Sequence, residues 1–303
     1  MGKTVIVGMG ALGLLFGQQF ADNLGEDQVV FLMDEERRKK HEKDVSLING
    51  KERTFQMASP AEIAEPASLV VVATKYNGLR DAMKLMRGVV GKDTTIVALL
   101  NGISSEEILA EEYPREQIID TVAIGMDAVR NGTELTYHNM GRWQLGLSEN
   151  GSQARLDALC AYLDRAKVPY ELCTDIKRAM WSKFMLNVGV NQTCMIHNMS
   201  YIECCAPGKS YDEMLTCMRE VMAVGHKEGV MLTEEDLDRV IGVLHTLAEG
   251  DGCPSMLQDR MAGRKSEVEL FAGTVIRLGK KHGVPVSVNE AYYDRIQEIE
   301  SAY

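Results

Sequence analysis

The sequence predicts an α/β protein, with a mostly parallel Rossmann-type sheet in an amino-terminal domain and an all-helical carboxyl-terminal domain. Its 303 residues suit two domains, at roughly 150 residues each. The chain opens with a β-branched run, a glycine-rich turn and a helix, after which strand-like and helix-like segments alternate. Such alternation is typical of βαβ units in a parallel sheet. No strand pattern returns after residue 173, so we expect a dinucleotide-binding domain at 1–172 and a helical domain at 173–303.

The opening turn predicts a site for a dinucleotide. The run Val5–Val7 is typical of a strand buried on both faces, and a helix is expected to follow the glycines through about Asp22. The first glycine would allow the tight turn, the second would let a pyrophosphate approach the backbone, and the third would let the helix pack on the strand. The helix start would offer N–H groups and its positive dipole end to the phosphates. The predicted cofactor-binding residues are Gly8, Met9, Gly10, Ala11, Leu12 and Gly13.

The choice between NAD and NADP depends on the residues after the second predicted strand, Gln28–Met33. Asp34 ends this strand, and an acidic residue there commonly binds the adenosine ribose, which favours NAD. Arg37 or Arg38 could instead hold the 2′-phosphate of NADP, although such a charge run is also typical of a solvated helix start. Both cofactors therefore remain candidates.

Two further predicted strands are followed by polar residues. Leu69–Ala73 leads to Lys75, and Thr95–Leu100 leads to Asn101. Ligands of parallel sheets bind at the carboxyl ends of the strands, so we expect Lys75 and Asn101 to converge with the glycine turn and the acidic residue. Each of the two alone could equally be a surface or turn residue.

The rest of the first domain departs from simple alternation, and an Asn-Gly pair inside residues 45–57 is a hairpin signal. Residues Ile118–Met126 are apolar. The expected elements are a hairpin around Asn49-Gly50, strands at Glu134–His138 and Arg142–Leu147 paired with each other, a helix at Gln153–Ala166 and a strand at Tyr170–Cys173.

The first helix of the second domain, expected over residues 175–197, is apolar nearly all round and is therefore predicted to be buried. Lys183, Asn187 and Asn191 recur at helical spacing and so form one stripe. Because an unpaired buried charge is very costly, this stripe is predicted to line a polar site, although a solvent-facing stripe is the alternative. Further helices are expected at Tyr211–Glu228, Glu234–Leu247, Ser255–Met261, Ser266–His282 and Ser287–Ala302.

A second polar cluster begins at Ser255 and leads to Glu267, which is expected to open a helix. A carboxylate at that position is often only a cap or a partner of the helix dipole, so its role is open on this pattern alone.

Composition excludes several classes of function. The net charge of −11 makes a nucleic-acid partner improbable, because such a surface repels phosphates. No apolar run approaches the ~18 residues of a membrane span, and no signal-peptide layout is present, so we expect a cytoplasmic protein. The seven cysteines and six histidines show no metal-ligand or disulfide pattern, so no metal is expected. Long apolar helices would suit a homodimer interface or a core equally.

The combination of motifs resembles the ketopantoate reductases (2-dehydropantoate 2-reductases). The matching residues are the glycine turn, Lys75, Asn101, Lys183, Asn187, Asn191, Ser255 with the four residues after it, and Glu267. The resemblance implies an active site in the cleft between two domains. It also implies hydride transfer from a nicotinamide cofactor, usually NADPH, to 2-dehydropantoate. The product would be pantoate, for pantothenate and coenzyme A synthesis.

The resemblance also implies roles for these residues. Lys183 would be the general acid, and Glu267 would orient the substrate or the lysine. Asn187, Asn191 and Ser255 would hold the substrate, and Lys75 and Asn101 would lie near the nicotinamide. The family tends to carry a basic residue where this chain has Asp34, so the cofactor remains open. The alternatives are a reductase of another branched 2-keto acid (a D-2-hydroxyacid dehydrogenase), an unrelated dehydrogenase, or a non-catalytic dinucleotide-binding redox sensor.

Overall fold

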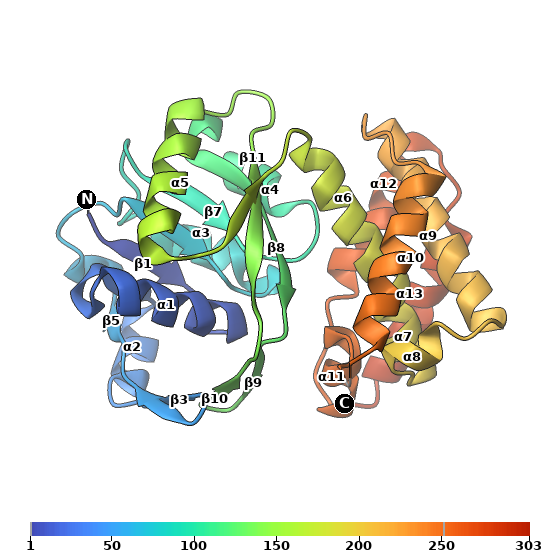
Figure 1. Ribbon diagram of the computed structural model, residues 1–303, viewed down its shortest axis with the longest axis horizontal. Helices are drawn as coiled ribbons and strands as arrows, with labels where there is room; N and C mark the ends of the chain where they lie inside the picture. The colour runs from blue at the N-terminus through green and yellow to red at the C-terminus, as the bar shows by residue number, and fades with distance from the viewer. Residues whose placement is uncertain (1, 251) are drawn as a thin grey trace. The chain divides into compact units, whose positions relative to one another are not determined.

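The computed structural model describes residues 2–250 and 252–303, which form two compact units (Figure 1). Unit 1 contains the chain up to Leu100 together with Ser104–Ile176, and unit 2 contains Asn101–Ile103 together with Lys177–Tyr303. Met1 and Asp251, which the two predicted domains include, lie outside the described residues. Asn101 belongs to unit 2 although it follows a strand of unit 1 in the sequence.

Unit 1 is built on an eight-stranded sheet with the order β12-β11-β8-β7-β6-β1-β2-β5. Its strands are β1 (Thr4–Val7), β2 (Val29–Leu32), β5 (Gln56–Ala58), β6 (Leu69–Val72), β7 (Thr95–Ala98), β8 (Ile118–Met126), β11 (Met140–Gly146) and β12 (Tyr170–Leu172). Strands β5, β2, β1, β6, β7 and β8 run parallel to one another, β11 and β12 are parallel to each other, and only the β8–β11 pairing is antiparallel among the described pairs of this sheet. The prediction of a mostly parallel sheet is confirmed.

Helices cover both faces of this sheet, which explains why its central strands are continuously apolar. Ile6 faces the core that α1 (Ala11–Leu24) and α5 (Gln153–Ala166) close, whereas Val5 and Val7 face the core that α3 (Leu79–Met86) and α4 (Ser105–Ala110) close. In the first core, the rings of Phe16 and Trp143 pack edge to face at 5.0 Å. The remaining helices of unit 1 are α2 (Glu35–His41), η1 (Glu26–Gln28), η2 (Pro60–Glu62), η3 (Tyr76–Gly78) and η4 (Arg115–Gln117).

A small four-stranded sheet corrects one sequence prediction. Its order is β4-β3-β10-β9, with β3 (Ser46–Ile48), β4 (Lys51–Arg53), β9 (Val129–Asn131) and β10 (Glu134–Thr136). The predicted hairpin is confirmed, because Asn49 (φ 47°) and Gly50 (φ 75°) form the turn between β3 and β4. The predicted pairing of Glu134–His138 with Arg142–Leu147 is wrong. The tight turn at Gly132 (φ 60°) pairs β10 with β9, while β11 pairs with β8.

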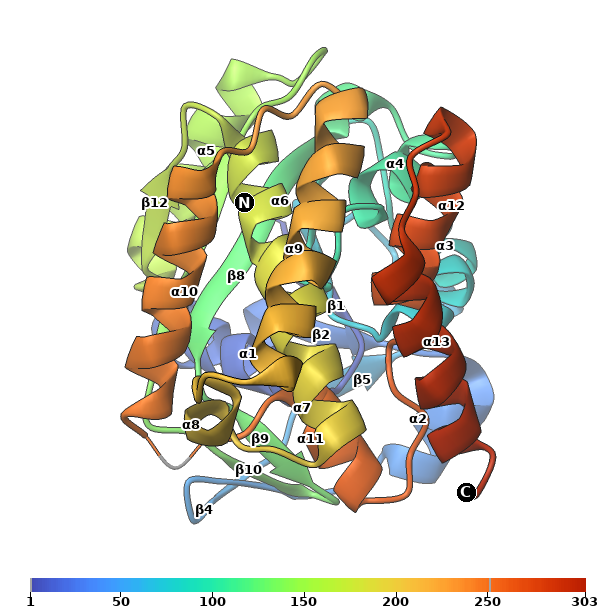
Figure 2. The same cartoon turned by 90° about the vertical axis from the view of Figure 1, so that its right-hand side faces the viewer.

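Unit 2 contains helices joined by loops and no strand among its described residues, as predicted, and Figure 2 shows its long helices. Helix α9 packs against α12, α13 and the π-helix η5. The elements are α6 (Ile176–Leu186), η5 (Asn187–Asn191), α7 (Gln192–His197), α8 (Tyr201–Cys204), α9 (Lys209–Lys227), α10 (Glu234–Ala248), α11 (Ser255–Met261), the π-helix η6 (Glu269–Gly273), α12 (Thr274–His282) and α13 (Ser287–Glu300).

Two predicted helices of unit 2 contain π-helical turns. The helix expected over 175–197 widens at η5, where Gly189 packs so closely on Met218 that an added Cβ would lie 2.4 Å from its Cε. The helix expected from Ser266 begins instead at η6, so Glu267 lies in the bend before it. Such turns are rare and are often found at functional sites. Here both carry or flank the predicted site residues.

The cysteine thiols are all free. Among residues 2–250 and 252–303, no three metal-binding side chains gather, and no helix has the length and apolarity needed to span a membrane.

Candidate active site

The glycine turn of unit 1 has the shape that a dinucleotide requires. Gly8 has φ 110°, and a Cβ there would lie 2.6 Å from the Ala73 carbonyl oxygen. A Cβ on Gly13 would lie 2.0 Å from the Gly8 carbonyl oxygen. Gly10 differs, because the nearest neighbour of its added Cβ would be the Ala73 oxygen at an ordinary 3.6 Å. Protein packing therefore requires the first and third glycines but leaves room for a Cβ at Gly10, the position where a dinucleotide-binding turn brings the pyrophosphate close to the backbone.

At the end of the glycine turn, hydrogen-bond donors are available for a pyrophosphate. Gly10 is the N-cap residue of α1 and has no side chain to cap the first N–H groups of the helix. The hydroxyl of Thr74 follows β6, beside Gly8, and is buried without a hydrogen-bond partner among the described residues. Both features suit an anionic ligand at this end of the sheet.

Arg130 is a contributor to this turn that the sequence did not indicate. Its guanidinium donates to the carbonyl oxygens of Met9 and Gly132, so the β9–β10 hairpin is attached to the glycine turn. Burial lowers the pKa of Arg130. Because Arg130 is 121 residues from Met9 in the sequence, no local pattern could have connected the two.

Asp34 directly follows Met33 at the carboxyl end of β2 and is the N-cap residue of α2. Its carboxylate accepts the Arg37 N–H at 2.8 Å and lies 3.5 Å from the Arg37 Nε. Arg38 instead forms ion pairs with Glu35, Glu42 and Glu62 at 3.2, 3.8 and 3.0 Å. Of the two candidate arginines, Arg37 is therefore the more accessible to a ligand, at 74% side-chain exposure against 21%.

The ends of β7, β6, β1 and β2 are neighbours in the sheet, as the predicted convergence of strand ends requires. Lys75 is exposed and begins the 3₁₀ turn η3, where its carbonyl oxygen accepts the Gly78 N–H at 2.9 Å. Asn101 follows β7, and its side chain binds Glu267 within unit 2.

A chain of hydrogen bonds connects three predicted site residues of unit 2. The Asn191 Nδ2 donates to the Asn187 Oδ1 at 3.1 Å, and the Ser255 Oγ donates to the Asn191 Oδ1 at 3.2 Å. The Met256 N–H also approaches that oxygen, at 3.4 Å. The asparagines are 8% and 7% exposed, so the alternative of a solvent-facing stripe is wrong for them.

Lys183, Glu267 and Asn101 form a second group of polar residues in unit 2, and the two groups are together called its polar cluster. The Asn101 Nδ2 donates to the Glu267 Oε2 at 3.1 Å. The Glu267 carboxylate is therefore committed to a side chain 166 residues away, while its main-chain carbonyl accepts the N–H groups of Leu270 and Phe271. Burial lowers the pKa of Lys183 to about 8, and the negative charge of Glu267 opposes this shift. A lysine of this kind can exchange a proton near neutral pH.

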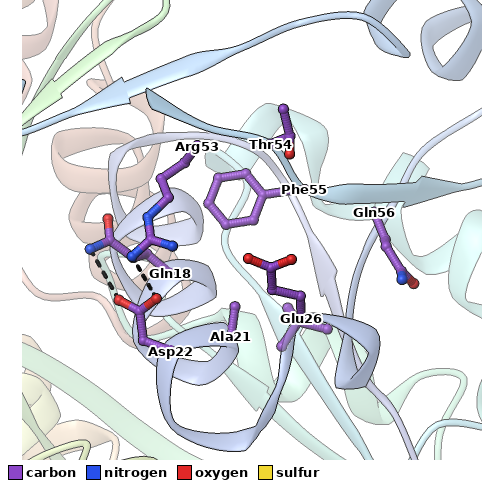
Figure 3. Close-up of a pocket in the computed structure, with 9 residues that line it drawn as sticks. Gln18, Ala21, Asp22, Glu26, Arg53, Thr54, Phe55 and Gln56 are labelled. Carbon is purple, nitrogen blue, oxygen red and sulfur yellow. Dashed lines mark hydrogen bonds and ion pairs between the residues drawn. The ribbon is translucent and has the colours of Figure 1, made fainter. Parts of the chain in front are cut away.

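A surface cavity of about 180 Å³ lies elsewhere in unit 1, near the end of α1 (Figure 3). Asp22 binds the Gln18 amide at 3.4 Å and Arg53 at 2.6 Å along its rim, and the Phe55 ring lines it. The predicted site residues do not line this cavity.

Comparison with known proteins identifies the family. Residues 4–150 match the family model described as "Ketopantoate reductase PanE/ApbA", and residues 175–300 match "Ketopantoate reductase PanE/ApbA C terminal". The chain is 27% identical to the 2-dehydropantoate 2-reductase of Halobacterium salinarum, over 97% of this chain and 98% of that protein. It is thus an NAD(P)H-dependent oxidoreductase acting on 2-keto acids. The chain belongs to the ketopantoate reductase family, as its motifs predict.

Solved structures agree with the fold. The 2-dehydropantoate 2-reductase of Geobacter metallireducens is similar with a TM-score of 0.84 and 27% identity, over 98% of this chain and 99% of that one. A ternary structure of D-mandelate dehydrogenase with NADH and anilino(oxo)acetate has a TM-score of 0.87 and 23% identity, over 99% and 98%.

Proposed function

We propose that this protein is a 2-dehydropantoate 2-reductase, which reduces ketopantoate to pantoate in pantothenate biosynthesis. The observation that supports this proposal most is the polar cluster of unit 2, in which Glu267 lies beside Lys183 and is held by Asn101. A nicotinamide dinucleotide, when bound, supplies the hydride that reduces the keto carbon. The chain's own residues then have to bind the keto acid and protonate its oxygen.

Lys183 is the proposed general acid. With a pKa of about 8, its amine is mostly protonated at neutral pH but gives up the proton readily. Negative charge develops on the carbonyl oxygen during reduction, and a positioned ammonium stabilises this charge and then neutralises it. The Glu267 carboxylate favours the charged form of Lys183, and the hydrogen bond from Asn101 fixes the orientation of that carboxylate.

Asn187, Asn191 and Ser255 are proposed to hold the hydroxyl and carboxylate groups of the substrate. Their amides and hydroxyl already form one hydrogen-bonded chain, so they are pre-organised and lose little freedom on binding. Lys75 and Asn101 are proposed to act near the nicotinamide, as the family resemblance implies.

We propose NADH rather than NADPH as the preferred cofactor. The Asp34 carboxylate at the end of β2 would accept hydrogen bonds from a ribose and repel a 2′-phosphate. Arg38 is engaged by three carboxylates, and Arg37 lies against Asp34 itself. Comparison of KM for NADH and NADPH tests this choice in the wild type and in Asp34→Asn. A large wild-type preference for NADPH would contradict it.

Asp34 also favours a second candidate, an NADH-dependent reductase of another branched 2-keto acid. The family tends to carry a basic residue at this position, and the similar D-mandelate dehydrogenase was determined with NADH. Such an enzyme would use the same general acid, and it would differ in the substrate groups that the amides of Asn187 and Asn191 bind.

A panel of 2-keto acids ranked by kcat/KM separates the two candidates. With the preferred cofactor, we expect kcat/KM for ketopantoate to exceed kcat/KM for 2-ketoisovalerate and for phenylglyoxylate. A higher kcat/KM for either of the others would establish the second candidate. Tight cofactor binding without turnover on any keto acid would instead indicate a dinucleotide-binding sensor.

A further inference from the structure

The residue before Glu267 is held by a buried carboxylate from helix α13. The Glu300 Oε1 accepts the Ser266 N–H at 2.7 Å and the Ser266 hydroxyl at 2.5 Å. Glu300 is 5% exposed and Ser266 is 8% exposed, so water cannot readily replace either bond. Hydrogen bonds to a charged acceptor are roughly twice as strong as neutral ones, so Glu300 restrains this stretch of main chain strongly.

A second contact from α13 lies on the other side of Glu267. The Tyr293 hydroxyl donates to the Glu269 Oε1. Tyr293 and Glu300 are about two helical turns apart and so lie on the same side of α13. Ile296, between them, is fully buried. One helix therefore binds the chain immediately before and shortly after Glu267.

The segment that carries Glu267 needs such support. Residues 262–268 connect α11 to η6 without regular helix, and irregular segments are generally the more mobile parts of a protein. The Glu267 carboxylate must nevertheless stay within hydrogen-bond distance of Asn101. Contacts that fix its neighbours supply the restraint that a regular element would otherwise give.

We propose that Glu300 is a positioning residue for Glu267, acting through Ser266, with Tyr293 giving a weaker restraint from the other side. This inference rests on the proposed function, in which Glu267 supports the general acid Lys183. Misplacement of a reacting group by about 1 Å can cost on the order of 10²-fold in rate. Loss of Glu300 should therefore lower catalysis although Glu300 is not assigned contact with the substrate.

Three variants test the restraint. Glu300→Ala removes the acceptor of both bonds, and we expect kcat to fall by about 10- to 100-fold with little change in the Kd of the dinucleotide. Glu300→Gln keeps an oxygen that can accept both bonds, so it should retain kcat within about threefold. Ser266→Ala removes only the hydroxyl and should lower kcat by a few-fold. If Glu300→Ala does not fold, the kcat of Ser266→Ala provides the test of the restraint.

Glu220 offers a matched control within the same unit. Its carboxylate accepts two main-chain N–H groups, those of Val288 and Asn289 at 2.9 Å each, at the opposite end of α13, whereas Glu300 accepts one N–H and one hydroxyl. Glu220→Ala should lower the Tm but leave kcat within about twofold. If Glu220→Ala and Glu300→Ala lower kcat equally for an equal fall in Tm, the role of Glu300 is only structural and the proposal is overturned.

A crystal structure of Glu300→Ala, or of Ser266→Ala if the first does not fold, separates this inference from the proposed function. In Glu300→Ala we expect the bond from Asn101 Nδ2 to Glu267 Oε2 to lengthen from 3.1 Å beyond hydrogen-bond distance, and in Ser266→Ala, which keeps the main-chain bond to Glu300, to lengthen by less. An unchanged bond overturns the positioning role whatever the enzyme reduces. A wild type that turns over no 2-keto acid refutes the proposed function, while a lengthened bond would still support the positioning of Glu267 by Glu300.

Discussion

The glycine turn of unit 1 and the polar cluster of unit 2 are built in opposite ways. The turn depends on backbone, since Gly8 and Gly13 are required because there is no room for a Cβ. The cluster depends on side chains from separate segments, as the bond between Asn101 and Glu267 illustrates. A backbone site is specified by the spacing of a few neighbouring residues, whereas a side-chain site exists only after the chain has folded. The two should therefore fail differently when mutated.

The largest effect is expected at Lys183. Lys183→Met keeps a long unbranched side chain but removes the proton that the carbonyl oxygen must receive, so kcat for reduction should fall by about 10²- to 10⁴-fold. The Kd of the dinucleotide should change less than about twofold, because the glycine turn is intact. Steady-state kinetics and fluorescence titration measure both. Lys177→Met, an exposed lysine of the same helix, is the control. Wild-type-like turnover by Lys183→Met would exclude it as the acid.

The same contrast explains what the sequence could predict. The glycines, the parallel sheet and the stripe of Asn187 and Asn191 follow from local spacing. The structure confirms the mostly parallel sheet, has the glycines between β1 and α1, and buries both asparagines. The hydrogen bond between Glu267 and Asn101 could not be predicted from the sequence. A carboxylate near a helix start has the same local pattern whether it caps the helix or binds a distant side chain. Arg130 was missed because its contact with Met9 joins segments 121 residues apart. The predicted pairing of β10 with β11 was wrong for a related reason, because alternating apolar and polar residues indicate strands but not which strands pair.

The second prediction compares two glycines of the turn. Gly10 has φ −76°, which alanine readily adopts, so Gly10→Ala should keep the wild-type Tm but weaken dinucleotide binding by about 10-fold. Gly13→Ala should lower the Tm, because its Cβ would overlap the Gly8 carbonyl oxygen and overpacking typically costs about 1–3 kcal/mol. Thermal unfolding and binding titrations distinguish the two. If Gly10→Ala binds like the wild type, the space beside Gly10 does not hold the pyrophosphate.

The third prediction concerns Asn191, the central member of the hydrogen-bonded chain. Asn191→Ala leaves Asn187 and Ser255 without their shared partner, and an unsatisfied polar group typically costs about 1–3 kcal/mol. We expect KM for the keto acid to rise by about 10-fold, with a smaller change in kcat. Asn289→Ala is the control, because this buried amide binds Cys217 and Glu220 instead. A rise in KM that is no larger for Asn191→Ala than for Asn289→Ala would remove Asn191 from the substrate site.

The smallest and most diagnostic effect is a shift in pH dependence. Lys183 must be protonated to act as the acid, so kcat/KM for reduction should be high below pH 8 and fall as the pH rises through the pKa of about 8. Oxidation of the hydroxy acid needs the neutral amine and should rise over the same range. The charge of Glu267 raises the pKa of Lys183, so Glu267→Gln should move the pH transitions of both the reduction and the oxidation to lower pH. Because glutamine can still accept the hydrogen bond from Asn101, the shift would report charge rather than lost structure. Transitions that stay at the same pH, or move to higher pH, would show that Glu267 does not act on Lys183 and that the polar cluster of unit 2 serves binding alone.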